Sequence, residues 1–96
     1  MGGHEPVAST TAIPLGGGVI VAGVVITQPA PGVFVAFDTT CPHLGCAVRA
    51  IAAGTINCFC HGSRFRIADG SVAGGPAREP LTRRAIVVRD GEISLA

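Results

Sequence analysis

Short apolar runs separated by turn signals fill most of the chain. Eight runs have the length and composition of β-strands, and they are Val19–Ala22, Val24–Thr27, Val33–Phe37, Val48–Ile51, Thr55–Asn57, Phe65–Ile67, Ala85–Arg89 and Glu92–Leu95. Turn-forming residues lie between them at Ala22-Gly23, Pro29 to Gly32, Ala53-Gly54, Asp69-Gly70 and Asp90-Gly91. No window of useful length repeats its apolar residues with a helical period. The pattern predicts an all-β fold, a small antiparallel barrel or sandwich, because a small sheet must manage its edges.

The most apolar stretch, Ile13 to Pro29, is better explained by two buried strands than by a membrane span. Its apolar part, Ile13 to Thr27, is shorter than the roughly 20 residues that a helix needs to cross a bilayer. It also contains four Gly and one Pro. A turn at Ala22-Gly23 divides it into two strand-length pieces. We therefore expect no membrane span in this chain.

Length and composition predict one globular domain. Of the 96 residues, 48% are hydrophobic and only 14% are charged, which is the balance of a folded chain. The polar start predicts a flexible N-terminal segment over residues 1–10, followed by a domain over residues 11–96. That start lacks the basic residues and apolar run of a signal peptide. A net charge of +1 gives no support for a nucleic-acid partner.

Two clusters of cysteine and histidine carry the candidate chemistry. The first has the spacing Cys41-x-His43-x-x-Cys46, and the second reads Cys58-x-Cys60-His61. Both lie between predicted strands, so two loops at the tips of neighbouring hairpins can converge on one point. Four Cys and two His exceed by two the ligands of one tetrahedral metal or of one cluster of two irons and two sulfides. Either the surplus is a pair of cysteines joined as a disulfide, or four Cys bind the metal and two His are spare.

The sequence resembles a known family at these clusters. "CPHLGC" followed by "CFCHGS" is similar to the Rieske iron–sulfur signature in its disulfide-containing form. The 11 residues between Cys46 and Cys58 have the expected number, and "GGPA" at Gly74 to Ala77 is similar to the family's Gly/Pro loop. The resemblance spans most of the chain after about Thr10. The chain most resembles the small single-domain Rieske proteins of high-GC Gram-positive bacteria.

The resemblance implies a Rieske-type 2Fe-2S cluster with two protein ligands on each iron. Cys41 and Cys58 would bind one iron, and His43 and His61 would bind the other. The remaining cysteines, Cys46 and Cys60, would form a disulfide. All six would lie in two hairpin loops at one end of a small antiparallel β barrel or sandwich.

The resemblance also implies which residues tune and cover the cluster. Two His in place of two thiolates leave the oxidised centre neutral, which raises the potential to about −150 to +300 mV from about −400 mV. Ser63 occupies the position whose hydroxyl donates to a bridging sulfide, whereas Phe65 replaces a Tyr that cytochrome bc complexes typically carry. We expect a potential above disulfide-free Rieske ferredoxins and below those complexes. Leu44 would shield the cluster and contact a partner, and the loop at Gly75 and Pro76 would cover it.

The predicted function is one-electron transfer, with no substrate bond broken by the chain itself. The partner would be a redox protein: a cytochrome, a quinol-oxidising complex, or a reductase or oxidase subunit. The alternative is a small redox subunit of a larger oxidoreductase or quinol-oxidising complex, and a structural zinc module is a more distant one. A disulfide beside the cluster predicts an exported or cell-envelope protein, of which this chain is the soluble portion.

Overall fold

A computed structural model of the chain describes residues 5–40, 46–59 and 62–96. These residues form eleven strands and one short 3-10 helix. The elements are β1 (Pro6–Ser9), η1 (Thr10–Ala12), β2 (Gly18–Val21), β3 (Val24–Ala30), β4 (Val33–Asp38), β5 (Val48–Ala52), β6 (Thr55–Cys58), β7 (Arg64–Arg66), β8 (Val72–Gly74), β9 (Arg83–Arg84), β10 (Ile86–Arg89) and β11 (Glu92–Leu95). The all-β prediction is confirmed.

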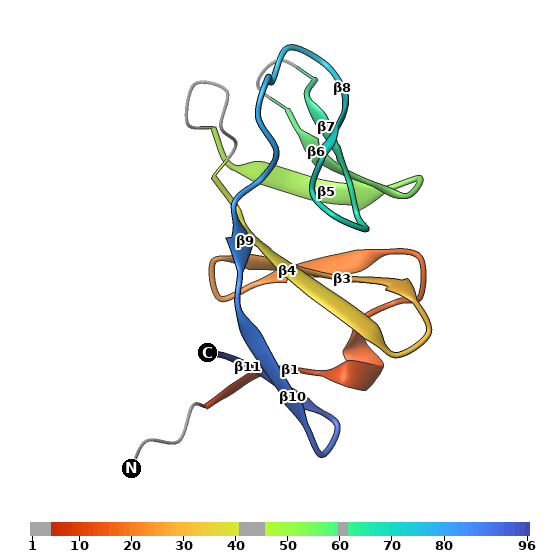
Figure 1. The fold of residues 1–96 in the computed structure, drawn as a ribbon, viewed down its shortest axis with the longest axis vertical. Helices are drawn as coiled ribbons and strands as arrows, with labels where there is room; N and C mark the ends of the chain where they lie inside the picture. The colour runs from red at the N-terminus through yellow and green to blue at the C-terminus, as the bar shows by residue number, and fades with distance from the viewer. Residues whose placement is uncertain (1–4, 41–45, 60–61) are drawn as a thin grey trace.

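The strands form three antiparallel sheets that follow one another along the long axis of the molecule (Figure 1). The base sheet has the order β1-β11-β10 and lies at the end of the molecule where the C-terminus is found. The central sheet has the order β2-β3-β4-β9. The tip sheet has the order β5-β6-β7-β8 and lies at the opposite end from the base sheet. Both cysteine clusters border strands of the tip sheet, because one follows β4 and precedes β5 and the other follows β6.

Three of the predicted turns are tight hairpin turns. Ala22, Ala53 and Asp90 have φ angles of 52° to 54°, and each is followed by a glycine with φ between 76° and 78°. Two successive residues with positive φ make a type I′ turn, whose twist matches that of the paired strands. The hairpins β2–β3, β5–β6 and β10–β11 are therefore set by local sequence, as predicted.

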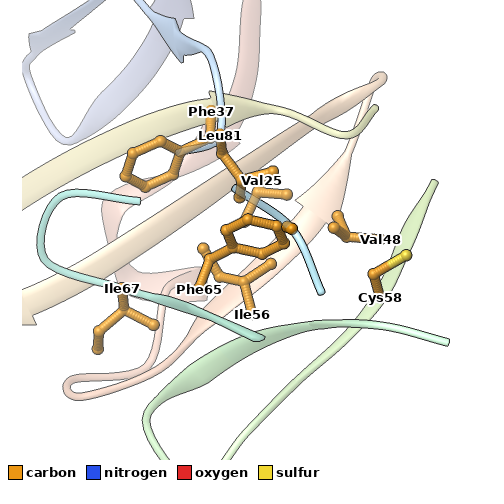
Figure 2. Packing of buried hydrophobic residues seen from close by; sticks show 9 residues of the cluster. Val25, Phe37, Val48, Ile56, Cys58, Phe65, Ile67 and Leu81 are labelled. Carbon is orange, nitrogen blue, oxygen red and sulfur yellow. The ribbon is translucent and has the colours of Figure 1, made fainter. Parts of the chain in front are cut away.

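The central sheet is buried on both faces, which explains the continuous apolar run in β3. Val25 faces the tip sheet, while Val24 and Ile26 face the base sheet, because successive side chains of a strand alternate between faces. The buried residues on the tip side, here the tip core, are Val25, Phe37, Val48, Ile56, Cys58, Phe65, Ile67, Ala77 and Leu81 (Figure 2). Those on the other side, the base core, are Ile13, Val24, Ile26, Ala36 and Ile93.

Three short strands have no counterpart in the predicted pattern. Within the segment that the sequence placed ahead of the domain, Pro6–Ser9 form β1 and pair with β11. β8 and β9 have three and two residues and contain Gly74 and two arginines, so neither shows an apolar run. Their strand conformation comes from pairing with β7 and β4 rather than from local propensity.

Within its described residues, the structure contains no helix of the length and hydropathy needed to cross a bilayer.

Candidate metal centre

Of the six candidate cysteine and histidine residues, the structure describes Cys46 and Cys58. Cys41, His43, Cys60 and His61 lie outside the described residues, as does Leu44. Their predicted roles therefore stay predictions. The described residues that border the two clusters show how the site is framed.

The first cluster is bordered by two backbone contacts that bring its flanks together. Thr40 and Ala47 form an isolated antiparallel bridge. The backbone N–H of Val48 donates to the carbonyl oxygen of Thr39 at 2.7 Å. The residues between Thr40 and Ala47 thus begin and end at one place, where β4 passes into β5.

The flanks of the second cysteine–histidine cluster are also held together by backbone contacts. The backbone N–H of Cys58 donates to the carbonyl oxygen of Ser63 at 2.8 Å. Cys58 is also the antiparallel partner of Val48, at the start of β5. The flanks of both clusters therefore lie on adjacent strands of the tip sheet. This part of the predicted convergence, the juxtaposition of the two loop bases, is confirmed.

Cys58 lies at one end of the tip core, next to Val48 (Figure 2). Its side chain is 2% exposed. Of the two described cysteines, Cys58 is a free thiol and Cys46 is not. Cys46 is half-buried and packs against the tip core. The two described sulfurs thus lie against the same apolar cluster but in different chemical states.

Ser63 is buried beneath the loop that follows β8. Its side chain is 1% exposed, and its Oγ accepts a hydrogen bond from the backbone N–H of Ala77 at 3.2 Å. Gly75 has a φ of 87° and lies directly against Gly62 and Ser63. A Cβ added to Gly75 would collide with Ser63 Cα and would lie 2.7 Å from the carbonyl oxygen of Gly62. Only glycine fits there, so the loop at Gly75 packs onto Gly62 and Ser63, which directly follow the second cysteine–histidine cluster.

Phe65 is fully buried in the tip core, two residues beyond Ser63. Its neighbours in β7, Arg64 and Arg66, are exposed, as the alternation of a strand requires. The Phe65 side chain contributes packing area and has no hydrogen to donate.

Among the described residues, Asp69 has a shifted pKa. The hydroxyl group and then the backbone N–H of Ser71 hold the pKa of this exposed carboxyl below its usual 3.8. The N–H of Ser71 donates to Asp69 Oδ1 at 2.9 Å. The interaction caps the turn between β7 and β8 and belongs to the tip sheet rather than to the candidate ligands.

The sequence model of one family, the Rieske [2Fe-2S] domain, matches residues 6–89. This chain belongs to that family. Its cofactor is accordingly a Rieske-type 2Fe-2S cluster.

Known Rieske proteins are similar to this chain over part or all of its length. It is 38% identical over 60 residues to the cytochrome b6-f complex iron-sulfur subunit of Gloeobacter violaceus, covering 62% of this chain and 32% of that protein. The crystal structure of the cyanobacterial plasma membrane Rieske protein PetC3 from Synechocystis PCC 6803 superposes with a TM-score of 0.69. The identity is 33%, and the match covers 76% of this chain and 75% of that one.

The ferredoxin of Sphingomonas yanoikuyae B1 has the same fold, with a TM-score of 0.73, 19% identity and 97% of each chain covered. The chain spans at most 32% of the length of the curated relatives it matches.

The described residues fit a Rieske cluster. A free, buried cysteine thiol is a suitable iron ligand, and the Rieske cluster takes two such thiolates and two imidazoles. The described residues contain no group of three or more metal-ligating side chains, and four of the six candidates lie outside them. Sequence reasoning did not single out Ala77, because its hydrogen bond to Ser63 is made by a backbone N–H that side-chain patterns do not reveal.

Proposed function

We propose that this Rieske domain is a one-electron carrier. Cys41 and Cys58 would hold one iron of the cluster, and His43 and His61 would hold the other. The cluster supplies one-electron chemistry when it is bound. The observation that carries the proposal is the buried free thiol of Cys58, placed where the bases of both cysteine clusters meet.

We further propose a disulfide between Cys46 and Cys60. Cys46 is not a free thiol, in contrast to Cys58. Closing a loop of about 15 residues would stabilise the fold by about 3 kcal/mol in the chain-entropy model. The bond would also fix the distance between the two loops that carry the ligands. Such a bond is typical of an oxidising compartment, and we propose that the protein is exported or lies at the cell envelope.

The potential is proposed to lie between two classes of Rieske protein. Ser63 can donate a hydrogen bond to a bridging sulfide, which stabilises the extra negative charge of the reduced cluster. Phe65 supplies no second donor. We expect a potential above that of disulfide-free Rieske ferredoxins and below that of cytochrome bc complexes.

The partner is proposed to be a redox protein that contacts Leu44. Two similarities support partners of different kinds. One relative is the iron-sulfur subunit of a cytochrome b6-f complex. A structure with the same fold is a ferredoxin in complex with the oxygenase of carbazole 1,9a-dioxygenase, matched with a TM-score of 0.72 and 23% identity.

The second candidate function is a small redox subunit of a larger oxidoreductase or quinol-oxidising complex. The 38% identity to the cytochrome b6-f subunit favours it. Affinity purification of the tagged protein from its own cells distinguishes the two. A stoichiometric multi-subunit complex supports the subunit, whereas a transient partner captured only by cross-linking supports the free carrier.

A redox titration of the purified holoprotein tests the electron-carrier proposal. We expect iron and acid-labile sulfide in equal amounts, a visible absorption that bleaches on reduction, and one reversible one-electron wave. Spin resonance of the reduced protein should have the low average g value of a His-ligated cluster. A colourless protein with one zinc per chain would overturn the proposal in favour of a structural metal module.

A further inference from the structure

Among the described residues, the Ser63 hydroxyl has one hydrogen-bond partner, the backbone N–H of Ala77. A serine hydroxyl has one hydrogen to donate and two lone pairs to accept with. Its Oγ accepts from the backbone N–H of Ala77, at 3.2 Å and in a buried position. No described residue accepts a hydrogen bond from the Ser63 hydroxyl. Among the described residues, the hydroxyl therefore has one occupied lone pair and a hydrogen that none of them accepts.

The Ala77 amide is held in place from both sides. On one side, Gly75 is packed so closely on Gly62 and Ser63 that no side chain fits between them. On the other, Ala77 is 6% exposed and belongs to the tip core. Pro76, between them, has a fixed φ angle. The loop cannot shift its amide away from Ser63 without leaving the tip core or opening the Gly75 contact.

We infer that Ala77 is a positioning residue for the Rieske cluster and acts through Ser63. An N–H pointed at Oγ repels the hydroxyl hydrogen from its own direction, so the hydrogen turns away from the covering loop. Accepting a hydrogen bond also polarises the O–H group and makes it a better donor. Ala77 thus directs the Ser63 hydroxyl hydrogen toward the cluster sulfide. This inference rests on the proposed function, in which Ser63 faces that sulfide.

The predicted signature is coupling between the two positions. Ala77→Pro removes the N–H, and Ser63→Ala removes the hydroxyl. If Ala77 acts through Ser63, Ala77→Pro lowers the midpoint potential by a large part of the shift that Ser63→Ala produces. In the Ser63→Ala background, the same proline substitution changes the potential by less than a third as much. Ala77→Gly keeps the N–H but loses the methyl group that packs in the tip core, so its shift in potential reports lost packing alone and should be smaller than that of Ala77→Pro.

Redox titrations of the wild type, the three single variants and the double variant provide the test, with spin-resonance spectra recorded on each. If Ala77→Pro shifts the midpoint potential equally in the wild type and in Ser63→Ala, the inference is wrong. It is also wrong if Ala77→Pro leaves the potential of the otherwise wild-type protein unchanged. Where the proline variant does not fold, semisynthesis with lactic acid at position 77 replaces the N–H by an ester oxygen without adding a ring. A wild-type protein that binds no iron would refute the proposed function, whereas an iron-loaded protein with additive shifts would refute this inference alone.

Discussion

The two faces of the central sheet pack against cores of different kinds. The buried residues of the base core are aliphatic, and the half-buried ring of Phe34 packs against them. The tip core contains two aromatic rings, those of Phe37 and Phe65, and the thiol of Cys58. The same two strands, β3 and β4, contribute to both, since their alternate residues face opposite ways. One sheet thus packs against a mainly aliphatic core on one face and against the core that contains Cys58 on the other.

The buried polar side chains follow the same division. Thr27 and Ser63 are the buried polar residues of the described chain. Thr27 Oγ1 donates to the carbonyl oxygen of Ile67 at 2.8 Å, and Ser63 Oγ accepts from Ala77. Each hydrogen bond therefore has a tip-core residue as its partner, Ile67 for Thr27 and Ala77 for Ser63. Hydrogen bonds have strict geometry, so these two bonds hold the tip-core residues that they join in a defined arrangement. Changes in the base should alter stability, and changes at the tip should alter the cluster.

The largest expected effect is at Cys58. Cys58→Ala should abolish cluster binding, because a methyl group cannot replace a thiolate ligand. Iron and acid-labile sulfide analysis should find none per chain. The double variant Cys46→Ala/Cys60→Ala is the control. It should retain the cluster and lose about 3 kcal/mol of unfolding free energy, the value expected for a disulfide that closes a loop of about 15 residues. Loss of iron from the double variant would mean that the ligand and disulfide cysteines are assigned the wrong way round.

Ile93→Ala tests the base. Ile93 is fully buried, so truncating it should cost about 2–5 kcal/mol of unfolding free energy. The midpoint potential should stay at the wild-type value, because Ile93 belongs to the base core. Denaturant unfolding and a redox titration of the same sample measure both quantities. A potential that moved as far as it does in Ser63→Ala would show that the two cores are not independent.

Phe65→Tyr should raise the potential. The ring is already buried in the tip core with Cys58, and the substitution adds one hydroxyl donor. A hydrogen bond that favours the reduced cluster by about 1 kcal/mol raises a one-electron potential by roughly 40 mV. Phe37→Tyr is the matched change within the same core and should have a smaller effect on the potential. Equal shifts in both variants would point to a general change of polarity instead of a specific donor.

The smallest expected effect concerns Asp69, in the turn of the tip sheet. Because the folded-state pKa is lowered, its contribution to stability is present above pH 3.8 and is lost as pH falls through the folded pKa. Carboxyl chemical shifts measured against pH should place this pKa below 3.8. Ser71→Ala removes the hydroxyl interaction and should raise the pKa of Asp69 toward 3.8. An unchanged pKa in that variant would assign the shift to the backbone N–H of Ser71.

The sequence predicts the hairpins well because each depends on a two-residue turn and on the apolar runs beside it. Ala22-Gly23, Ala53-Gly54 and Asp90-Gly91 specify type I′ turns, and the apolar runs beside them became strands. β1 is different, because it pairs with β11 more than 80 residues away in the sequence. No local pattern can reveal such a pairing, and Val7 and Ala8 alone make too short an apolar run.

At the candidate site, the sequence reveals the features that depend on side-chain type and not those that depend on the backbone. The spacing of cysteines and histidines indicated the Rieske family, which the match over residues 6–89 confirms. Phe65 and Ser63 are buried, and their roles in tuning the iron–sulfur cluster stay predictions. The role of Ala77 could not be predicted, because any residue except proline has the same backbone N–H.

The hydrogen bond from Thr27 to Ile67 has a consequence for how the central and tip sheets are joined. It links β3 to the turn after β7, between residues 40 positions apart, inside the protein and away from water. Separating the two sheets would leave a buried hydroxyl and a buried carbonyl unpaired, at a cost of about 1–3 kcal/mol for each group. The threonine hydroxyl thereby resists local opening between the two sheets, in addition to the apolar packing around it.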